Sequence, residues 1–173
     1  MIPGLYTCDQ LQRAIATDPD RWRPLVFTNG CFDLLHAGHV RYLQAARALG
    51  RSLVVGLNSD TSVRQLKPQK PHLPPRPIVP EAQRAEVLAA LRAVDGVVIF
   101  AEATAVSLLQ ALQPDIYAKG GDYTLDSLPE APTVLGYGGR IELIRIEVPS
   151  STSGLIRQIL AAVDVPRPQE TLQ

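Results

Sequence analysis

The stretch PLVFTNGCFDLLHAGHV, residues 24–40, joins an apolar run to a helical pattern through a loop that contains glycine and precedes two histidines. Its apolar run, Leu25–Thr28, is short and apolar on both faces, which is typical of a strand covered on both sides of a parallel sheet. From Val40 onward, apolar residues recur with helical spacing until Gly50, where a C-terminal helix cap is expected. The stretch therefore predicts a strand, a loop beyond its carboxyl end, and a helix.

The same alternation of apolar runs and helical patterns continues along the chain. Four more strands are predicted, at Leu53–Leu57, Val97–Phe100, Asp115–Ala118 and Ile141–Ile146. Helical patterns separate these runs, and the last predicted helix is Leu155–Val163. This order of elements predicts an α/β fold with a Rossmann-like, doubly wound, five-stranded parallel sheet and helices on both faces.

The composition fits one globular domain of 173 residues. Lys plus Arg equals Asp plus Glu at 17 each, so no overall field recruits nucleic acid or an anionic membrane. No apolar run approaches the roughly 20 residues of a membrane span, and the N-terminus lacks the apolar core of a secretory signal. Cys8 and Cys31 have no disulfide-framework spacing, so a reducing cytoplasmic location is expected. The chain divides into an N-terminal helical segment at 1–23, a main domain at 24–163 and a C-terminal tail at 164–173.

In doubly wound sheets, ligands bind beyond the carboxyl ends of the strands, so the loops at those ends form the candidate site. His36 and His39 stand three residues apart at the predicted start of a helix, so both rings can point the same way. A helix start favours an anion such as phosphate, and Gly38 lets the backbone approach that anion closely. Two other interpretations stay open: the histidines are core or capping residues, or they belong to a metal site that Cys31 or Asp33 completes.

Three further groups lie on loops at the predicted strand ends. Lys67 and Arg76 flank a proline-rich loop, and mobile cations there suit a phosphate, with solvated surface charge as the alternative. KGGDY, residues 119–123, exposes glycine backbone to a base or ribose, or simply forms a tight turn. SSTS, residues 150–153, is a second anion site at a helix start, or an ordinary helix cap.

These motifs resemble the two signatures of the HxGH (cytidylyltransferase-like) nucleotidyltransferase superfamily, which are HAGH and a Ser/Thr run that opens a late helix. Roughly residues 8–162 contain, in order, the strings VFTNGCFDLLHAGHVRYLQAARALG, VVGLNSDTSVRQLK, RPIVPEAQRAEVLAALRAVDGVVIF, LQPDIYAKGGDY and GYGGRIELI. The strings are similar to the sugar-phosphate adenylyltransferases that make ADP-heptose. The resemblance implies transfer of AMP from ATP to a sugar 1-phosphate such as D-glycero-β-D-manno-heptose 1-phosphate, with release of pyrophosphate.

The resemblance also implies a role for each matching residue. Catalysis is assigned to His36, His39 and Lys67, and binding of the acceptor phosphate or substrate to Arg76 and Arg84. The nucleotide would be bound by Asn29, Gly30, Cys31, Phe32, Gly38, Gly120, Asp122, Ser151, Thr152 and Ser153. Mg²⁺ would accompany ATP, with no metal ligands from the protein. The implied partners are ATP, a sugar 1-phosphate, a second copy in a homodimer and a separate sugar kinase earlier in the pathway, with no nucleic acid or membrane.

Two alternatives to this function stay open. The same signatures serve cytidylyltransferases that act on a small alcohol phosphate such as glycerol 3-phosphate. A nucleotide-binding module without catalysis would keep the fold, although it has no need of groups around an α-phosphate. The proline-rich loop, residues 67–80, also departs from the short glycine-containing turn of the family, so the resemblance does not define the acceptor.

Overall fold

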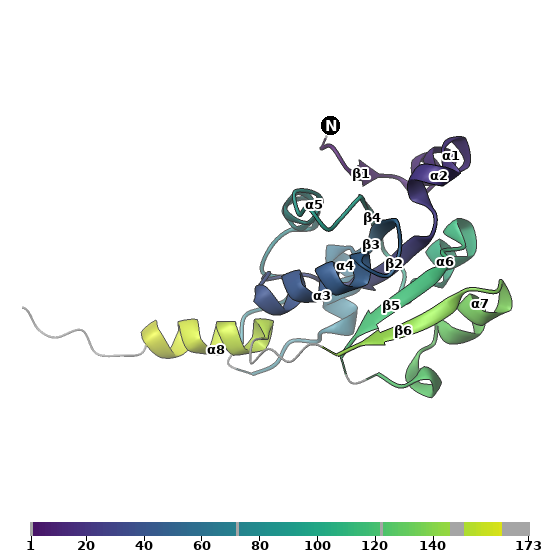
Figure 1. The fold of residues 1–173 in the computed structure, drawn as a ribbon. Helices are drawn as coiled ribbons and strands as arrows, with labels where there is room; N and C mark the ends of the chain where they lie inside the picture. Colours follow the sequence, from purple (N-terminus) through teal and green to yellow (C-terminus); the bar gives the residue numbers. More distant parts are fainter. Residues whose placement is uncertain (1, 72, 122, 146–150, 164–173) are drawn as a thin grey trace, which may run out of the picture.

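The computed structural model describes residues 2–71, 73–121, 123–145 and 151–163. Its centre is a six-stranded sheet in the order β1-β4-β3-β2-β5-β6 (Figure 1). The strands are β1 (Leu5–Tyr6), β2 (Leu25–Gly30), β3 (Ser52–Asn58), β4 (Gly96–Phe100), β5 (Ile116–Gly120) and β6 (Arg140–Ile144). Every neighbouring pair of these strands is parallel.

The predicted α/β class and parallel sheet are confirmed, but the strand count is six instead of five. The additional strand is β1, which pairs with β4 through Leu5–Val97 and Tyr6–Val98. Two residues are too few to show an alternating pattern, so the sequence gives no strand signal there. The segment 1–23, predicted as helical, therefore also contributes an edge strand to the sheet. The last residue of the predicted strand Ile141–Ile146 lies outside the described residues.

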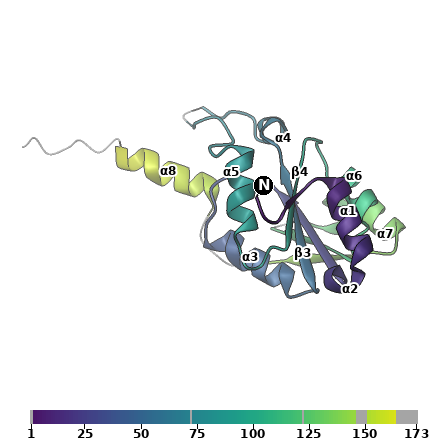
Figure 2. The same cartoon turned by 90° about the horizontal axis from the view of Figure 1, so that it is seen from above.

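Helices cover both faces of the sheet (Figure 2). They are α1 (Cys8–Thr17), α2 (Pro19–Trp22), α3 (Ala37–Arg47), α4 (Asp60–Leu66), α5 (Glu81–Ala89), α6 (Val106–Leu112), α7 (Ala131–Gly136) and α8 (Thr152–Val163), with a 3-10 turn η1 (Leu125–Ser127). Helices α3 and α5 contribute to one core, and α1, α6 and α7 contribute to the other. The prediction of helices on both faces is thus confirmed.

The two cores follow from the two-residue period of the strands, which sends successive side chains to opposite faces. Phe27 belongs to the same cluster as Leu109 of α6, while its neighbour Val26 belongs to the cluster of Leu43 in α3 and Leu88 in α5. All five side chains are fully buried. Each such burial contributes about 1.5–3 kcal/mol of hydrophobic free energy, so the central strands are held from both sides.

The chain changes face beside β2. Helix α3 follows β2 in the chain and packs on the same face of the sheet as α5. Helix α7 follows β5 and packs on the opposite face. Strand β2 has β3 on one side and β5 on the other, so its carboxyl end opens at a topological switch point. Gly30, the last residue of β2, therefore lies where ligands bind in this class of sheet.

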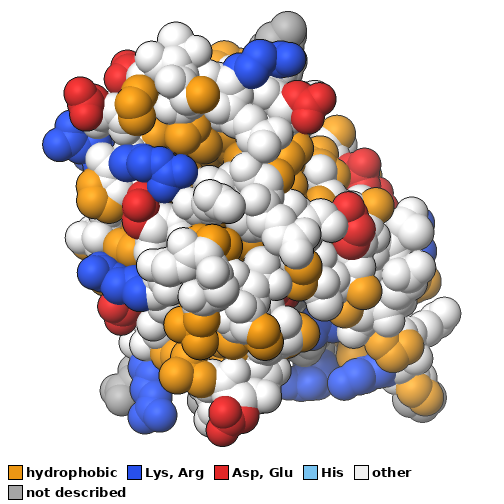
Figure 3. All heavy atoms as spheres, turned by 90° about the vertical axis from the view of Figure 1, so that its right-hand side faces the viewer, with side chains coloured by type: hydrophobic (Ala, Val, Ile, Leu, Met, Phe, Trp, Pro, Cys, Tyr) orange, Lys and Arg blue, Asp and Glu red, His pale blue; other side chains and the backbone are white. Residues whose placement is uncertain are grey.

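Figure 3 shows the side of the molecule where α6 and α7 lie in Figure 1. Charged side chains of one sign do not dominate this surface. Lys and Arg side chains are interspersed there with Asp, Glu and apolar side chains. This mixture agrees with the equal numbers of basic and acidic residues. Within the described ranges, no helix is both long enough and apolar enough to cross a membrane.

Candidate active site

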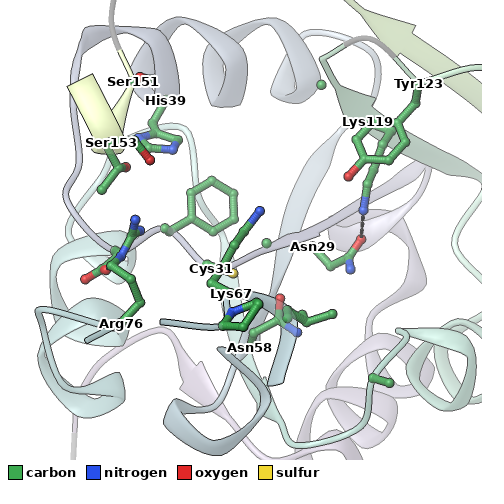
Figure 4. Close-up of a pocket in the computed structure, with 18 of the residues that line it drawn as sticks. Asn29, Cys31, His39, Asn58, Lys67, Arg76, Lys119, Tyr123, Ser151 and Ser153 are labelled. Atoms are coloured by element: carbon green, nitrogen blue, oxygen red, sulfur yellow. Dashed lines mark hydrogen bonds and ion pairs between the residues drawn. The ribbon is translucent and has the colours of Figure 1, made fainter. Parts of the chain in front are cut away.

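A cavity of about 690 Å³ opens at the carboxyl edge of the sheet, beside the switch point. Its walls come from the ends of β2 and β5, the start of α8, the loop after α4 and the loops that precede α6 and α7. In Figure 4, side chains from these separate segments surround one space. Residues far apart in the sequence therefore form a single site.

Most of the residues that the sequence predicted for the site line this cavity. They are Asn29, Gly30, Cys31, Phe32, His39, Lys67, Arg76, Gly120, Ser151, Thr152 and Ser153. The cavity lining does not include His36, Gly38 or Arg84. Asp122, predicted to bind the nucleotide, lies outside the described residues.

His36 is the N-cap of α3. Its Nδ1 accepts a hydrogen bond from the backbone N–H of Gly38 at 3.1 Å, which satisfies one of the unpaired donors at the helix start. Burial lowers the pKa of His36, so the ring is neutral at pH 7 and carries its proton on Nε2. His36 therefore caps α3 through Nδ1, and this hydrogen bond leaves its Nε2–H free of the cap. The catalytic role that the resemblance implies for His36 stays a prediction.

His39 lies against His36, with ring centroids 4.0 Å apart, and against Phe32, with centroids 5.4 Å apart. Burial, with a smaller contribution from His36, lowers the pKa of His39 to about 4, so this ring is also neutral at pH 7. Its Nδ1 is buried and has no hydrogen-bond partner in the part of the chain that the structure describes. Because His39 lines the cavity, it can offer a neutral hydrogen-bonding group to a ligand there.

The start of α8 lies beside His39 in the cavity wall (Figure 4). Ser151 Oγ accepts a hydrogen bond from the N–H of Gly154 at 3.1 Å, and Thr152 Oγ1 donates to the Leu34 carbonyl oxygen at 3.3 Å. The second bond ties α8 to the loop that precedes α3. Two helix starts therefore contribute lining residues to the same part of the cavity, and the partial positive charge of each favours an anion.

Asp33 fixes the end of the proline-rich loop. Its side chain is fully buried, accepts hydrogen bonds from the N–H groups of Ile78 and Val79 at 2.9 Å, and forms an ion pair with Arg76. This pairing holds Arg76 in the cavity wall. It also engages the Asp33 carboxylate, one of the two groups that the metal interpretation offered as a third ligand. Among the described residues, no group of three His, Cys, Asp or Glu side chains is placed to hold a metal ion.

The prediction for Arg84 needs correction. This residue was predicted to bind the acceptor phosphate, but it is 2% exposed and does not line the cavity. Its guanidinium donates to the carbonyl oxygens of Val79 at 2.8 Å, Cys31 at 2.6 Å and Asn58 at 2.9 Å, and to Asp60 Oδ1 at 2.7 Å. Arg84 thus joins the loops after β2 and β3 to the segment before α5. It is a positioning residue, because it acts through the loops it holds.

Lys119 lies on the other side of the cavity from His39 and was not among the predicted site residues (Figure 4). Lys119 Nζ donates to Asn29 Oδ1 at 2.9 Å and to the Tyr117 hydroxyl at 3.2 Å. Burial lowers the pKa of Lys119, and the nearby Glu130 carboxylate opposes that shift. The signal available in the sequence was a lysine at the carboxyl end of a predicted strand, next to two glycines.

Comparison with known proteins connects this site to a family. The family model described as cytidylyltransferase-like matches residues 27–153. The chain belongs to the cytidylyltransferase-like family. The match spans both helix starts and the loops of the cavity, so the HxGH resemblance predicted from HAGH and SSTS is confirmed at the level of the family.

Curated relatives of this cytidylyltransferase-like chain include two proteins named "Bifunctional protein HldE". That of Citrifermentans bemidjiense is 50% identical over 154 residues, which cover 89% of this chain and 31% of the relative. That of Pelobacter propionicus is 51% identical over 152 residues, which cover 88% of this chain and 30% of the relative. The chain thus spans about a third of the length of the curated relatives it matches.

Solved structures share the fold. The crystal structure of a lipopolysaccharide core biosynthesis protein from Thermoplasma volcanium is 27% identical, with a TM-score of 0.58, and the match covers 72% of this chain and 97% of that one. A macrolide-efflux protein from Streptococcus pneumoniae is 22% identical, with a TM-score of 0.53, and the match covers 77% and 50% of the two chains. The second similarity shows the fold alone.

Proposed function

We propose that the chain is an adenylyltransferase that transfers AMP from ATP to a sugar 1-phosphate, with D-glycero-β-D-manno-heptose 1-phosphate as the leading acceptor. The observation that carries the proposal is that His39, Ser153 at the start of α8, Lys67 and Arg76 line one cavity at the switch point of the sheet. Membership of the cytidylyltransferase-like family and about 50% identity to proteins named HldE also support it.

The proposed reaction needs positioning and charge stabilisation, without a nucleophile from the protein. An oxygen of the sugar 1-phosphate attacks the α-phosphorus of ATP, and a new P–O bond forms. The bond from the α-phosphorus to the oxygen that bridges to the β-phosphorus breaks, and pyrophosphate leaves with that electron pair. His39 and the two helix starts bind the phosphates near the leaving group. Lys67 and Arg76 supply positive charge where the α-phosphate meets the acceptor phosphate.

Mg²⁺ is the cofactor that the resemblance implies. Among the described residues, the carboxylates in the cavity wall are Asp33, which is already fully paired, and Glu130, which is 4% exposed and accepts a hydrogen bond from the Ala105 N–H at 3.3 Å. The described residues therefore do not fit a cage for the ion. Mg²⁺ fits this site better when carried by the phosphate oxygens of the nucleotide, as it commonly is, where it neutralises part of their charge.

The proposed function includes two protein partners. A sugar kinase would supply the 1-phosphate group of the acceptor, and a second copy of the chain would complete a homodimer. A cytidylyltransferase that acts on glycerol 3-phosphate is the second candidate, since the family description itself names that class of enzyme.

The test measures pyrophosphate release with ATP or CTP against heptose 1-phosphate and glycerol 3-phosphate. We expect turnover with ATP and the sugar 1-phosphate. Turnover with CTP alone would establish the second candidate. Nucleotide binding without turnover on any acceptor would contradict the proposal and identify a non-catalytic module.

A further inference from the structure

Lys119, Asn29 and Tyr117 form a hydrogen-bonded triad in the cavity wall, and their chemistry determines how each group is oriented. An ammonium only donates, so the Asn29 atom 2.9 Å from Lys119 Nζ must be the amide oxygen. The same oxygen lies 2.7 Å from the Tyr117 hydroxyl, which donates to it and accepts from Lys119 at 3.2 Å. Both lone pairs of Asn29 Oδ1 are therefore occupied.

The triad leaves hydrogen-bond donors available to a ligand. Lys119 has three N–H groups, of which the triad uses two. Asn29 keeps both N–H groups of its amide, because only its oxygen takes part in the triad. Since Lys119 and Asn29 both line the cavity, this wall presents N–H groups to oxygen atoms that can accept hydrogen bonds.

Apolar surface lies next to these donors. Lys119 Nζ lies 5.3 Å from the centroid of the Tyr123 ring, and Tyr123 lines the cavity and is 45% exposed. Leu128 and Pro129 line the same cavity. A polyol such as a sugar carries hydroxyl oxygens that accept hydrogen bonds and C–H groups that pack against apolar side chains. The wall around Lys119 is complementary to both features.

We propose that Lys119 determines the specificity for the acceptor by donating a hydrogen bond to a hydroxyl oxygen of the sugar, with Asn29 and Tyr117 holding its ammonium in place. This inference rests on the proposed function. The triphosphate is assigned to the part of the cavity formed by His39 and the two helix starts, across the cavity from Lys119 (Figure 4). The ring nitrogens of adenine could accept hydrogen bonds from this wall, but its exocyclic amine needs an acceptor, and both lone pairs of Asn29 Oδ1 are occupied.

The experiment compares steady-state kinetics of the wild-type chain, Lys119→Met and Lys119→Gln, with Arg92→Met as the control. Arg92 is exposed and does not line the cavity. In Lys119→Met we expect the KM for the sugar 1-phosphate to rise about 10- to 100-fold, which is the scale for one hydrogen bond to a charged group. The KM for ATP should stay within about twofold. The preference for the sugar 1-phosphate over glycerol 3-phosphate should fall by the same factor as the KM rises.

The outcomes separate this inference from the function on which it rests. A wild-type chain that uses no sugar 1-phosphate overturns both. If the wild-type chain turns over the sugar 1-phosphate, the proposed function holds and Lys119 is tested separately. Its role is overturned if Lys119→Met changes the KM for ATP or leaves the acceptor KM unchanged. If the Tm shows that Lys119→Met is unfolded, Lys119→Gln decides instead. The glutamine amide can donate a hydrogen bond but carries no charge, so we expect the acceptor KM of Lys119→Gln to rise by an intermediate factor. The acceptor KM of the control Arg92→Met should not change.

Discussion

Replacing Arg84 with methionine tests whether this residue is a positioning residue. The substitution keeps a long apolar side chain in the core but removes every donor of the guanidinium. The carbonyl oxygens of Val79, Cys31 and Asn58 each lose a hydrogen bond, and Asp60 loses its ion-pair partner. All of these groups lie on segments that form the cavity wall or adjoin it. We therefore expect both stability and activity to fall.

The size of the loss follows from the burial of the two partners. The Arg84 side chain is fully buried, whereas the Asp60 side chain is 24% exposed and can regain some water. Removing one partner of a buried pair costs about 3–5 kcal/mol, and partial hydration of Asp60 favours the lower end. Each carbonyl oxygen left without its donor adds about 1 kcal/mol or less, since water can replace some of the bonds. Together these contributions predict a loss of about 3–6 kcal/mol in the free energy of unfolding.

Urea unfolding at pH 7, followed by circular dichroism, measures this loss directly. Arg92→Met is the matched control, because Arg92 is exposed, and it should change the free energy of unfolding by less than about 0.5 kcal/mol. A loss below about 1 kcal/mol in Arg84→Met would refute the positioning role. A variant of normal stability whose only defect is a raised acceptor KM would instead restore the sequence prediction that Arg84 binds the acceptor.

Three further predictions concern His39 and Asp33. His39→Ala should lower the rate of nucleotidyl transfer at least about 10²-fold, the scale for one preorganised donor; a rate near wild type would contradict its role. The pKa of His39 is about 4 in the folded chain against 6.5 as its ordinary value, so between pH 7 and 5 protons bind chiefly to the unfolded chain. The free energy of unfolding should therefore fall as the pH is lowered from 7 to 5, and it should fall less in His39→Asn than in the wild-type chain. An equal fall in the two proteins would contradict a buried, neutral His39 ring. Asp33→Asn should speed hydrogen exchange at the Ile78 and Val79 amides about tenfold or more, measured by mass spectrometry, and unchanged exchange would show that Asp33 does not hold the loop.

The sequence predicted the parts of the site that local chemistry encodes. Apolar runs with sharp ends locate the strands from β2 to β6, and a parallel sheet brings their carboxyl ends to one edge. For this reason Gly30, His39, Lys67 and Ser153, which lie on four different segments, were predicted together and do line one cavity. The Ser/Thr run at the start of α8 was predictable because hydroxyl side chains cap helices.

The remaining features depend on tertiary contacts that no local pattern encodes. Arg84 lies one helical turn before Leu88, so its spacing places it on the buried face of α5. What no local pattern shows is the approach of the loops after β2 and β3, whose carbonyl oxygens accept its hydrogen bonds. Gly120 was predicted to let a ligand approach its backbone, but a Cβ at this position would also lie 2.7 Å from the Tyr42 ring of α3. A larger residue at this position would therefore disturb the packing of β5 against α3, which is a second reason for glycine there. Lys119 became a candidate only when β5 placed it beside Asn29 of β2.

A crystal structure of the chain with Mg²⁺ and α,β-methylene-ATP, which cannot lose pyrophosphate, tests the central claim most directly. Our account predicts that the triphosphate lies against His39 and the start of α8, with the α-phosphate facing Lys67. A nucleotide bound anywhere else, or a triphosphate seated against Lys119 and Asn29, would contradict it.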